Sequence, residues 1–428
     1  MKKHTINGTC GVVIITLVIV AALTGCGSSV GPFMEWDGVT TDTSWYDDGE
    51  TDFSITTAAA LAGLAELANG GNNFSGKTIT QKVNIDLKGH DWTSIGITTD
   101  DTTWFKGVYN GNGKTISNLA IISDQDYINY VGLFGFIDFG GTVENLKLVA
   151  VNINLTGDSY CAGGVAGDNY GTIKNCSVSG FVKTYNTAGG VAGYNEGTIQ
   201  YCYSTCTVEG TLSVGGVVGT NIGTVQYCYA TGAVSGIISV GGVAGENSGE
   251  IKNCYATATV SGETAIGGLS GNNVFGGTVR NCYATGDVTG SEHTGGVVGY
   301  NDQSTIQNCY ATGNVEGDLS TGGVVGSAYG NDTIENCVAL NNSITGSTYV
   351  SRVIGHRNTS SSLDNNYGSE DIPGTWSNIG LDDYDGEDVI AADYRGANSD
   401  TWWKNTAGFP DSDWIFAKNK LPALKMNN

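Results

Sequence analysis

Seven cysteines recur at nearly constant spacing in the middle of the chain. They lie 26 to 28 residues apart and are Cys176, Cys202, Cys228, Cys254, Cys282, Cys309 and Cys337. Regularly spaced thiols can form disulfides, bind a metal or pack as small buried groups. Side chains stacked on neighbouring strands keep their Cβ atoms about 4.8 Å apart, beyond the roughly 3.5–4.5 Å that a disulfide prefers. The four histidines are scattered and give no zinc spacing. We therefore expect a structural core ladder of free thiols.

A tyrosine follows five of these cysteines, and a threonine stands two residues further on. The residues are Tyr203, Tyr229, Tyr255, Tyr283 and Tyr310, with Thr205, Thr231, Thr257, Thr285 and Thr312. A flat strip of rings with hydroxyls beside it is suited to stacking on sugar rings or packing against a protein. Stacked Tyr and Thr pairs also stabilise a sheet face with no ligand at all. Both interpretations stay open, and this is the candidate binding face.

The acidic residues are candidates for calcium binding and for catalysis. Asp383, Asp385 and Glu387 lie in an acidic run and offer the hard oxygens that calcium prefers, but the twelve-residue loop pattern is incomplete, and a solvated loop is the alternative. No other cofactor is expected. Asp168, Glu196 and the other acids of the repeat region occupy different positions in different copies, so they do not make the repeated carboxylate pair that polysaccharide-cleaving enzymes use. We expect a non-catalytic protein.

The N-terminus has the features of an export signal. Lys2 and Lys3 precede an apolar run over residues 12–23, and Leu23-Thr24-Gly25-Cys26 follows. This tetrapeptide resembles the bacterial lipobox, which implies cleavage before Cys26 and acylation of Cys26, so that lipid chains hold the protein to a membrane. An uncleaved membrane anchor is the other interpretation. The net charge of −23 argues against nucleic acid as a partner.

The cysteines belong to an internal repeat whose copies begin with a Gly-Gly pair at 163, 189, 215, 241, 267, 295 and 322. The Cys and the residues two and six positions later are small or apolar, which is the period of a strand with one face buried. An Ile or Val stands three residues before each Cys, so the alternation breaks between them. Asn175, Asn253 and their equivalents lie at this break, where a residue that tolerates left-handed geometry is needed. A corner of the chain is therefore predicted there.

Each copy thus consists of two or three short strands joined by bends, and it cannot bury its apolar side alone. Stacked copies bury it continuously and pair each strand with its counterpart one coil away. The sequence predicts an all-β fold, a parallel β-helix of about nine or ten coils. The blades of a β-propeller need roughly 40–50 residues, and leucine-rich repeats need a Leu pattern that these copies lack.

The cores GGVAG, GGVVG and GGLSG, together with the run NCYATG, closely resemble the GLUG motif, a repeat of bacterial surface proteins. The resemblance is strong over residues 132–345. It implies a right-handed β-helix at the cell surface and an occurrence in adhesin-like proteins. It implies no reaction, because a fold does not determine a function.

The predicted organisation has five parts. Residues 1–25 are the signal peptide, 26–50 a tether, 51–104 the N-terminal cap with the first strands, 105–358 the GLUG-repeat β-helix and 359–428 a Trp-rich C-terminal cap. A helix is predicted over 56–69, capped at Thr56 or Thr57 and ended by Gly70-Gly71. Trp376, Trp402, Trp403 and Trp414, with a short helix near 387–394, are expected to cover the last coil.

The expected function is that of an exported protein, lipid-anchored at the cell surface or outer membrane. It would act as an adhesin-like binding module for a glycan or a protein through its repetitive face. A structural spacer or envelope component is the alternative, and a polysaccharide lyase or hydrolase is the third hypothesis.

Overall fold

The computed structural model describes residues 32–97, 104–126, 129–158, 161–358 and 360–426. Residues from Phe33 onward form one compact unit. The predicted signal peptide and Cys26 lie outside the described residues. Within the described ranges, the helices are all too short or too polar to cross a membrane.

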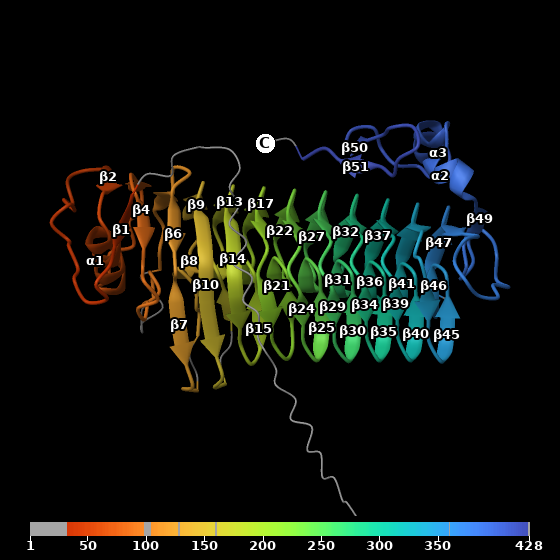
Figure 1. Ribbon diagram of the computed structural model, residues 1–428, viewed down its shortest axis with the longest axis horizontal. Helices are drawn as coiled ribbons and strands as arrows, with labels where there is room; N and C mark the ends of the chain where they lie inside the picture. The colour runs from red at the N-terminus through yellow and green to blue at the C-terminus, as the bar shows by residue number, and fades with distance from the viewer. Residues whose placement is uncertain (1–31, 98–103, 127–128, 159–160, 359, 427–428) are drawn as a thin grey trace, which may run out of the picture. The chain divides into compact units, whose positions relative to one another are not determined.

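The body is a parallel β-solenoid of about 11 turns, in which each strand pairs with its counterpart one coil away (Figure 1). Long sheets of 12, 20, 8 and 9 strands run along it. The predicted fold class is confirmed, but nine or ten coils is an underestimate. Strands on both sides of the repeat region, which lack its Gly-Gly and Cys pattern, also join the sheets.

The 12-stranded sheet carries the Ile or Val three residues before each Cys. Its strands are β2 (Asp52–Ile55), β3 (Thr78–Gln81), β5 (Val108–Asn110), β9 (Thr142–Glu144), β13 (Thr172–Lys174), β17 (Thr198–Gln200), β22 (Thr224–Gln226), β27 (Glu250–Lys252), β32 (Thr278–Arg280), β37 (Thr305–Gln307), β42 (Thr333–Glu335) and β47 (Ser362–Asp364).

The 20-stranded sheet, called the tyrosine sheet below, receives two short strands from most coils. Its strands are β1 (Phe33–Glu35), β4 (Asn84–Asp86), β6 (Thr115–Ser117), β7 (Ala120–Ser123), β10 (Lys147–Leu155), β14 (Ser177–Lys183), β18 (Tyr203–Ser204), β19 (Thr207–Glu209), β23 (Tyr229–Ala230), β24 (Val234–Ser235), β28 (Tyr255–Ala256), β29 (Val260–Ser261), β33 (Tyr283–Ala284), β34 (Val288–Thr289), β38 (Tyr310–Ala311), β39 (Val315–Glu316), β43 (Val338–Ala339), β44 (Ile344–Thr345), β48 (Tyr367–Ser369) and β49 (Glu387–Val389).

The two remaining long sheets meet at the Gly-Gly bends. The 8-stranded sheet contains β11 (Cys161–Gly163), β15 (Thr187–Gly189), β20 (Val214–Gly215), β25 (Ile238–Gly241), β30 (Thr264–Gly267), β35 (Glu292–Gly295), β40 (Leu319–Gly322) and β45 (Thr348–Ser351). The 9-stranded sheet contains β8 (Phe134–Ile137), β12 (Ala166–Asn169), β16 (Ala192–Asn195), β21 (Val218–Asn221), β26 (Ala244–Asn247), β31 (Ser270–Val274), β36 (Val298–Asp302), β41 (Val325–Tyr329) and β46 (Ile354–Arg357).

The Gly-Gly pair is needed because the chain bends between these sheets with no room for a side chain. A Cβ added to Gly189 would lie 1.8 Å from the carbonyl oxygen of Ala192. One added to Gly190 would lie 2.3 Å from the carbonyl oxygen of Gly216 in the next coil. Both distances are far below van der Waals contact, so only glycine fits at this bend.

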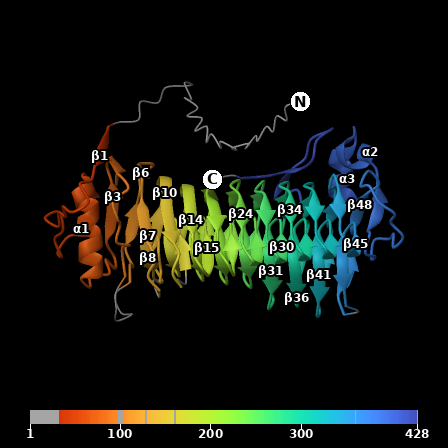
Figure 2. The same cartoon turned by 60° about the horizontal axis from the view of Figure 1, so that its bottom comes forward.

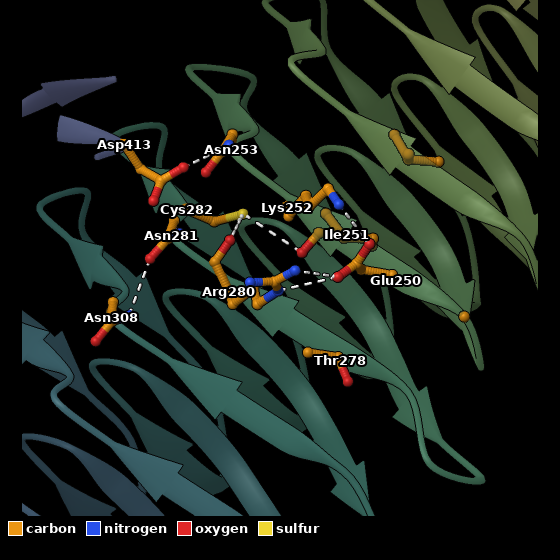
Figure 3. Close-up of polar contacts among 12 residues, drawn as sticks. Glu250, Ile251, Lys252, Asn253, Thr278, Arg280, Asn281, Cys282, Asn308 and Asp413 are labelled. Atoms are coloured by element: carbon orange, nitrogen blue, oxygen red, sulfur yellow. Dashed lines mark hydrogen bonds and ion pairs between the residues drawn. The ribbon is translucent and has the colours of Figure 1, made fainter. Parts of the chain in front are cut away.

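The corner before each Cys has the left-handed backbone that the sequence predicts. Asn175 and Asn253 have φ of 53° and 54°, and Tyr201 and Tyr227 take the same conformation in the two copies that lack the Asn. The Asn side chains also bond from coil to coil, as in the 2.9 Å hydrogen bond from Asn308 Nδ2 to Asn281 Oδ1 (Figure 3). Each corner therefore helps to align the coils.

The seven ladder cysteines are all buried and free. The backbone N–H of Cys176 donates to Cys202 Sγ over 3.4 Å, and the Cys202 thiol lies 3.3 Å from the carbonyl oxygen of Gln200. Burial raises the pKa of the Cys176 thiol well above its usual value, so this thiol stays neutral. The ladder packs as a column of small apolar groups.

A second, buried ladder consists of the Asn residue that ends strands of the 9-stranded sheet. Its members are Asn169, Asn195, Asn221, Asn247, Asn273 and Asn301. Each Nδ2 donates to the Oδ1 of the next Asn over 2.6–2.8 Å. The last, Asn301, donates to Asp332 Oδ1 over 2.8 Å. These amides therefore lie inside the solenoid and bond its coils to one another.

Helix α1 (Ala58–Asn69) covers the N-terminal end of the solenoid (Figure 2). The Thr57 hydroxyl accepts a hydrogen bond from the Ala60 N–H, and Leu61 and Leu64 are fully buried. The predicted tether over residues 26–50 is wrong for its described part after residue 32. Strand β1 pairs with β4, and the indole of Trp36 packs against that of Trp92, so apolar burial holds this segment to the first coils.

The C-terminal end of the solenoid is covered by residues 370–389, the part of the predicted Trp-rich cap that contains Trp376, and Trp376 packs against the solenoid core. Arg352 is 1% exposed and forms a 2.7 Å ion pair with Asp388. Asp385 Oδ1 accepts from the Arg352 N–H, and Asp385 Oδ2 accepts from the N–H groups of Ser377 and Asn378. These contacts hold residues 377–388 against the last coil.

Residues 391–426, called the C-terminal strap below, fold back along the side of the solenoid (Figures 1 and 2). The strap contains α2 (Ala391–Arg395), α3 (Ser399–Asn405) and the antiparallel pair β50 (Trp414–Ile415) and β51 (Ala423–Leu424). Its strands pair only with each other. The predicted short helix near 387–394 is replaced by β49 followed by α2.

Candidate functional site

The five tyrosines of the candidate face stand in one column of the tyrosine sheet. Neighbouring members are in register from Tyr203 to Tyr310. Their ring centroids are 4.8–5.0 Å apart, and their planes lie within 6° of parallel. Rings at this spacing lie offset against one another and cover much of each other's faces. The rings therefore form a stack in which each covers much of the next, rather than the expected flat strip.

The threonines lie beside this column at the ends of its strands. Thr205, Thr231 and Thr257 are exposed, whereas Thr285 and Thr312 are half-buried. The Thr231 N–H donates to the Ser204 carbonyl oxygen of the preceding coil over 3.0 Å. The threonine backbones thus help to pair the coils, and the exposed side chains belong to the coils nearer the N-terminus.

The C-terminal strap covers the far part of the tyrosine column. Tyr310 is 3% exposed, its ring lies 5.6 Å from that of Trp403, and its hydroxyl donates to the Pro422 carbonyl oxygen over 2.8 Å. The ring of Tyr283 lies 6.2 Å from that of Trp414, and burial raises the pKa of Tyr283 to about 12. The tryptophans of the strap therefore cover the side of several coils, and among them Trp402 contacts the last coil, with its ring 5.2 Å from that of Tyr367.

Two hydrogen bonds tie the strap to the corner column of the 12-stranded sheet, and one of them runs from Asn365 Nδ2 to the Thr406 carbonyl oxygen over 3.0 Å. Asn253 Nδ2 donates to Asp413 Oδ1 over 3.0 Å, across 160 residues of sequence (Figure 3). The strap also packs on the outer side of the solenoid through an aromatic cluster, in which Trp403, Phe409 and Trp414 pack together with Tyr310 and Tyr367. Because the cluster is separate from the solenoid core, the strap is an added element on a finished coil stack.

The near end of the column borders a groove of about 380 Å³, and Met426 at the end of the strap is one of the residues that line it. A second tyrosine stack begins there, in which the rings of Tyr201 and Tyr227 lie 4.9 Å apart and within 8° of parallel. The groove is lined by Gly113, Asn145, Lys147, Asn175, Cys176, Ser177, Tyr201, Tyr203, Tyr227, Tyr229 and Met426. Tyr203 is 36% exposed. The sequence pattern missed Tyr201 and Tyr227, which replace the corner Asn in just the two copies beside the groove.

The weak calcium candidate is not assembled in the structure. The carboxylate of Asp385 is 2% exposed and is saturated by backbone N–H groups, while Asp383 and Glu387 are exposed. Throughout the described ranges, no three acidic, His or Cys side chains gather as metal ligands would. The acidic run closes the end of the solenoid. The arrangement of Asp383, Asp385 and Glu387 contradicts the hypothesis that they bind calcium.

Two acids of neighbouring coils do approach one another on the 9-stranded sheet. Asp168 is 6% exposed, and burial raises its pKa to about 7, with the Glu196 carboxylate acting in the same direction. Glu196 accepts a 3.0 Å hydrogen bond from the Tyr194 hydroxyl. The repeat pattern did not reveal that these acids are close, because the residue in register with Asp168 in the next coil is Tyr194.

Four of the repeats match the GLUG motif, at residues 158–183, 236–261, 262–289 and 290–316. A protein of Evansella cellulosilytica, provisionally named a Gly-rich membrane protein, is 35% identical over 130 residues, which is 30% of this chain and 14% of the relative. Halomucin of Haloquadratum walsbyi is 32% identical over 173 residues, which is 39% of this chain and 2% of halomucin. The chain thus spans only a small part of both curated relatives.

A crystal structure of a Bacteroides ovatus protein, provisionally described as an immunoglobulin A1 protease, covers 89% of this chain and 94% of its own, with 20% identity and a TM-score of 0.38. The relatives and the GLUG repeats together indicate a repetitive protein associated with the surface or the membrane.

Proposed function

We propose that this protein is a cell-surface lipoprotein that binds glycans in an adhesin-like manner through the groove at the near end of the tyrosine column. The observation that carries the proposal is the groove itself. Two adjacent tyrosine stacks begin at the groove, one with Tyr201 and the other with Tyr203. No further tyrosine covers the outer face of either first ring. An aromatic face beside polar side chains is the usual means of holding a sugar ring.

The proposed role is binding without catalysis. Asp168 and Glu196 are the two acids described above as near each other. Asp168 is nearly buried, and Glu196 accepts a hydrogen bond from Tyr194. Neither arrangement resembles an open acid and base on either side of a bond to be cleaved. A purely structural spacer is the second candidate, and the uniform coil register over most of the chain favours it.

The test is binding to an array of cell-wall and host glycans by the mature protein. Replacing Tyr201 and Tyr203 together with Ser is expected to abolish binding, because both open ring faces are lost. The matched control is Tyr349→Ser, since Tyr349 is 55% exposed on the 8-stranded sheet. Glycan binding that survives the double substitution contradicts the site, and a wild-type protein that binds nothing favours the spacer.

The lipid anchor forms a separate part of the proposal and rests on Leu23-Thr24-Gly25-Cys26. Cells expressing Cys26→Ser are expected to lose fatty-acid labelling of the protein and to release it from the membrane fraction. Unchanged labelling in the variant contradicts acylation at Cys26.

A further inference from the structure

The outward column that holds the tyrosine ladder begins before the first tyrosine. Strand pairing places Thr115, Lys147, Ser177 and Tyr203 in successive coils at the same position. The column therefore changes from a lysine to a serine and then to a continuous stack of rings. Ser177 is the one small residue between two large side chains.

This change of residue size creates a slot one side chain wide. Lys147 and Tyr203 are two coils apart, so their backbones are separated by roughly 9.5 Å. A ring between them needs about 3.5–4 Å of contact distance on each side, or roughly 7–8 Å in all. Ser177 and Cys176 line the groove between them. A six-membered ring fits where a tyrosine of this coil would stand.

Two polar groups meet at the slot. Asn175 Nδ2 donates to Asn145 Oδ1 over 3.1 Å, while the next coil carries Tyr201 and has no amide to donate back. The Asn175 side-chain oxygen is thus the open end of the corner amide ladder, and Asn175 is exposed. It can accept a hydrogen bond from a hydroxyl group.

Lys147 is exposed and takes part in no ion pair with any residue that the structure describes. Its neighbour Lys174 is already paired with Glu144 at 2.8 Å. Lys147 lines the groove and stands in the same column as Ser177 and Tyr203. A carboxylate is the group that would pair with it.

We propose that the slot binds one carboxylated sugar unit of a glycan, with the sugar ring against Tyr203, its carboxylate at Lys147 and a hydroxyl donating to Asn175. The class is an acidic sugar, a uronic or sialic-type residue. The inference rests on the proposed function and narrows its ligand. Lys147 would attract the carboxylate by its charge, and the ring of Tyr203 would pack against the sugar ring.

The experiment compares acidic glycans with their own neutral forms on one array. The probes are carboxylated glycans and the same glycans after methyl esterification, applied to the full mature protein. The wild type is expected to bind the acidic forms about tenfold more tightly. Lys147→Gln is expected to reduce acidic binding to the level of the esters and to leave ester binding unchanged.

The matched control is Lys82→Gln, because Lys82 is also exposed, forms no ion pair with any described residue and lies outside the groove. It is expected to keep the acidic preference. Both lysines are exposed enough for the variants to fold, and equal melting temperatures check this.

The two levels of the proposal fail in different ways. Equal binding of acidic and esterified glycans, or an acidic preference that survives Lys147→Gln, overturns the acidic ligand and leaves glycan binding intact. Binding of neither form of any glycan overturns the proposed function and this inference with it.

Discussion

The near and far halves of the tyrosine column contain the same residue, in the same register and at the same ring spacing, yet they meet different surroundings. Tyr203 is 36% exposed beside a groove, and Tyr310 is 3% exposed beneath Trp403 and Trp414. The repeat makes the two halves alike. What distinguishes them comes from outside the repeat or from its irregular copies, namely the strap at one end and Ser177 at the other.

The difference shows where a repetitive scaffold places a specific site. A continuous stack covers its own ring faces, so the interior of the column offers edges only. An open face exists only where the stack stops. The site therefore lies at an interruption of the pattern, and the regular copies hold it in place.

The largest effect is expected from a substitution that weakens the packing of the strap on the far half of the column. Trp414 is 1% exposed against Phe409, Tyr310 and Tyr283. Trp414→Ala is expected to destabilise the strap by about 3–5 kcal/mol through lost contacts and a cavity. Hydrogen exchange should then quicken over residues 391–426 and leave the coils protected. Loss of protection throughout the solenoid would mean that the strap is part of the core.

The near half can be made to resemble the far half by closing the slot. Ser177→Tyr adds one ring to the column and fills the space that we assign to the sugar. Glycan binding is expected to weaken at least roughly 30-fold, or about 2 kcal/mol, while stability holds or rises. Ser261→Tyr is the control, because Ser261 is an exposed position in the other column of the tyrosine sheet. Unchanged binding to Ser177→Tyr places the ligand elsewhere.

The coil that contains Ser177 also carries Asp168, which gives this half a pH dependence of its own. The folded-state pKa near 7 is above the ordinary value of 3.8, so the folded protein holds the Asp168 proton more tightly. Stability from this group is fully present below about pH 4 and falls as the pH rises to about 7. Asp168→Asn is expected to remove this fall and to gain about 1–2 kcal/mol at pH 8.

Chemical denaturation at pH 4, 6 and 8 checks the expectation. Glu246→Gln on the same sheet is expected to change the pH dependence in the same direction, since burial also raises the pKa of Glu246. A wild-type protein whose stability rises from pH 4 to 8 while that of Asp168→Asn does not would contradict the raised pKa.

The repeating part of the fold could be predicted from the sequence because each copy shows the same spacing of apolar, Gly and Asn residues. The Cys column, the left-handed corner at Asn175 and the helix capped by Thr57 follow from local residue types and spacing. The first strand at Phe33–Glu35 was not predicted, because a single pass of extended chain has no periodicity of its own.

The site was only partly predictable for a related reason. The tyrosine column was visible as a repeat, but its covering by Trp403 and Trp414 depends on a segment that returns over a long stretch of sequence. The slot depends on Ser177, a residue that departs from the pattern. A search for repeats passes over such a residue, although the departure is what makes the site.

The buried asparagine ladder has a consequence for the size of the protein. Each copy brings one amide donor and one amide acceptor to it, and Asp332 receives the last donor. A copy inserted or deleted inside the array leaves the Nδ2 donor of every remaining Asn with an acceptor. The number of coils can therefore change by whole copies, as in unequal recombination. Such a change would move the groove farther from or closer to the C-terminal end of the solenoid. The residues at the groove and at that end would stay the same.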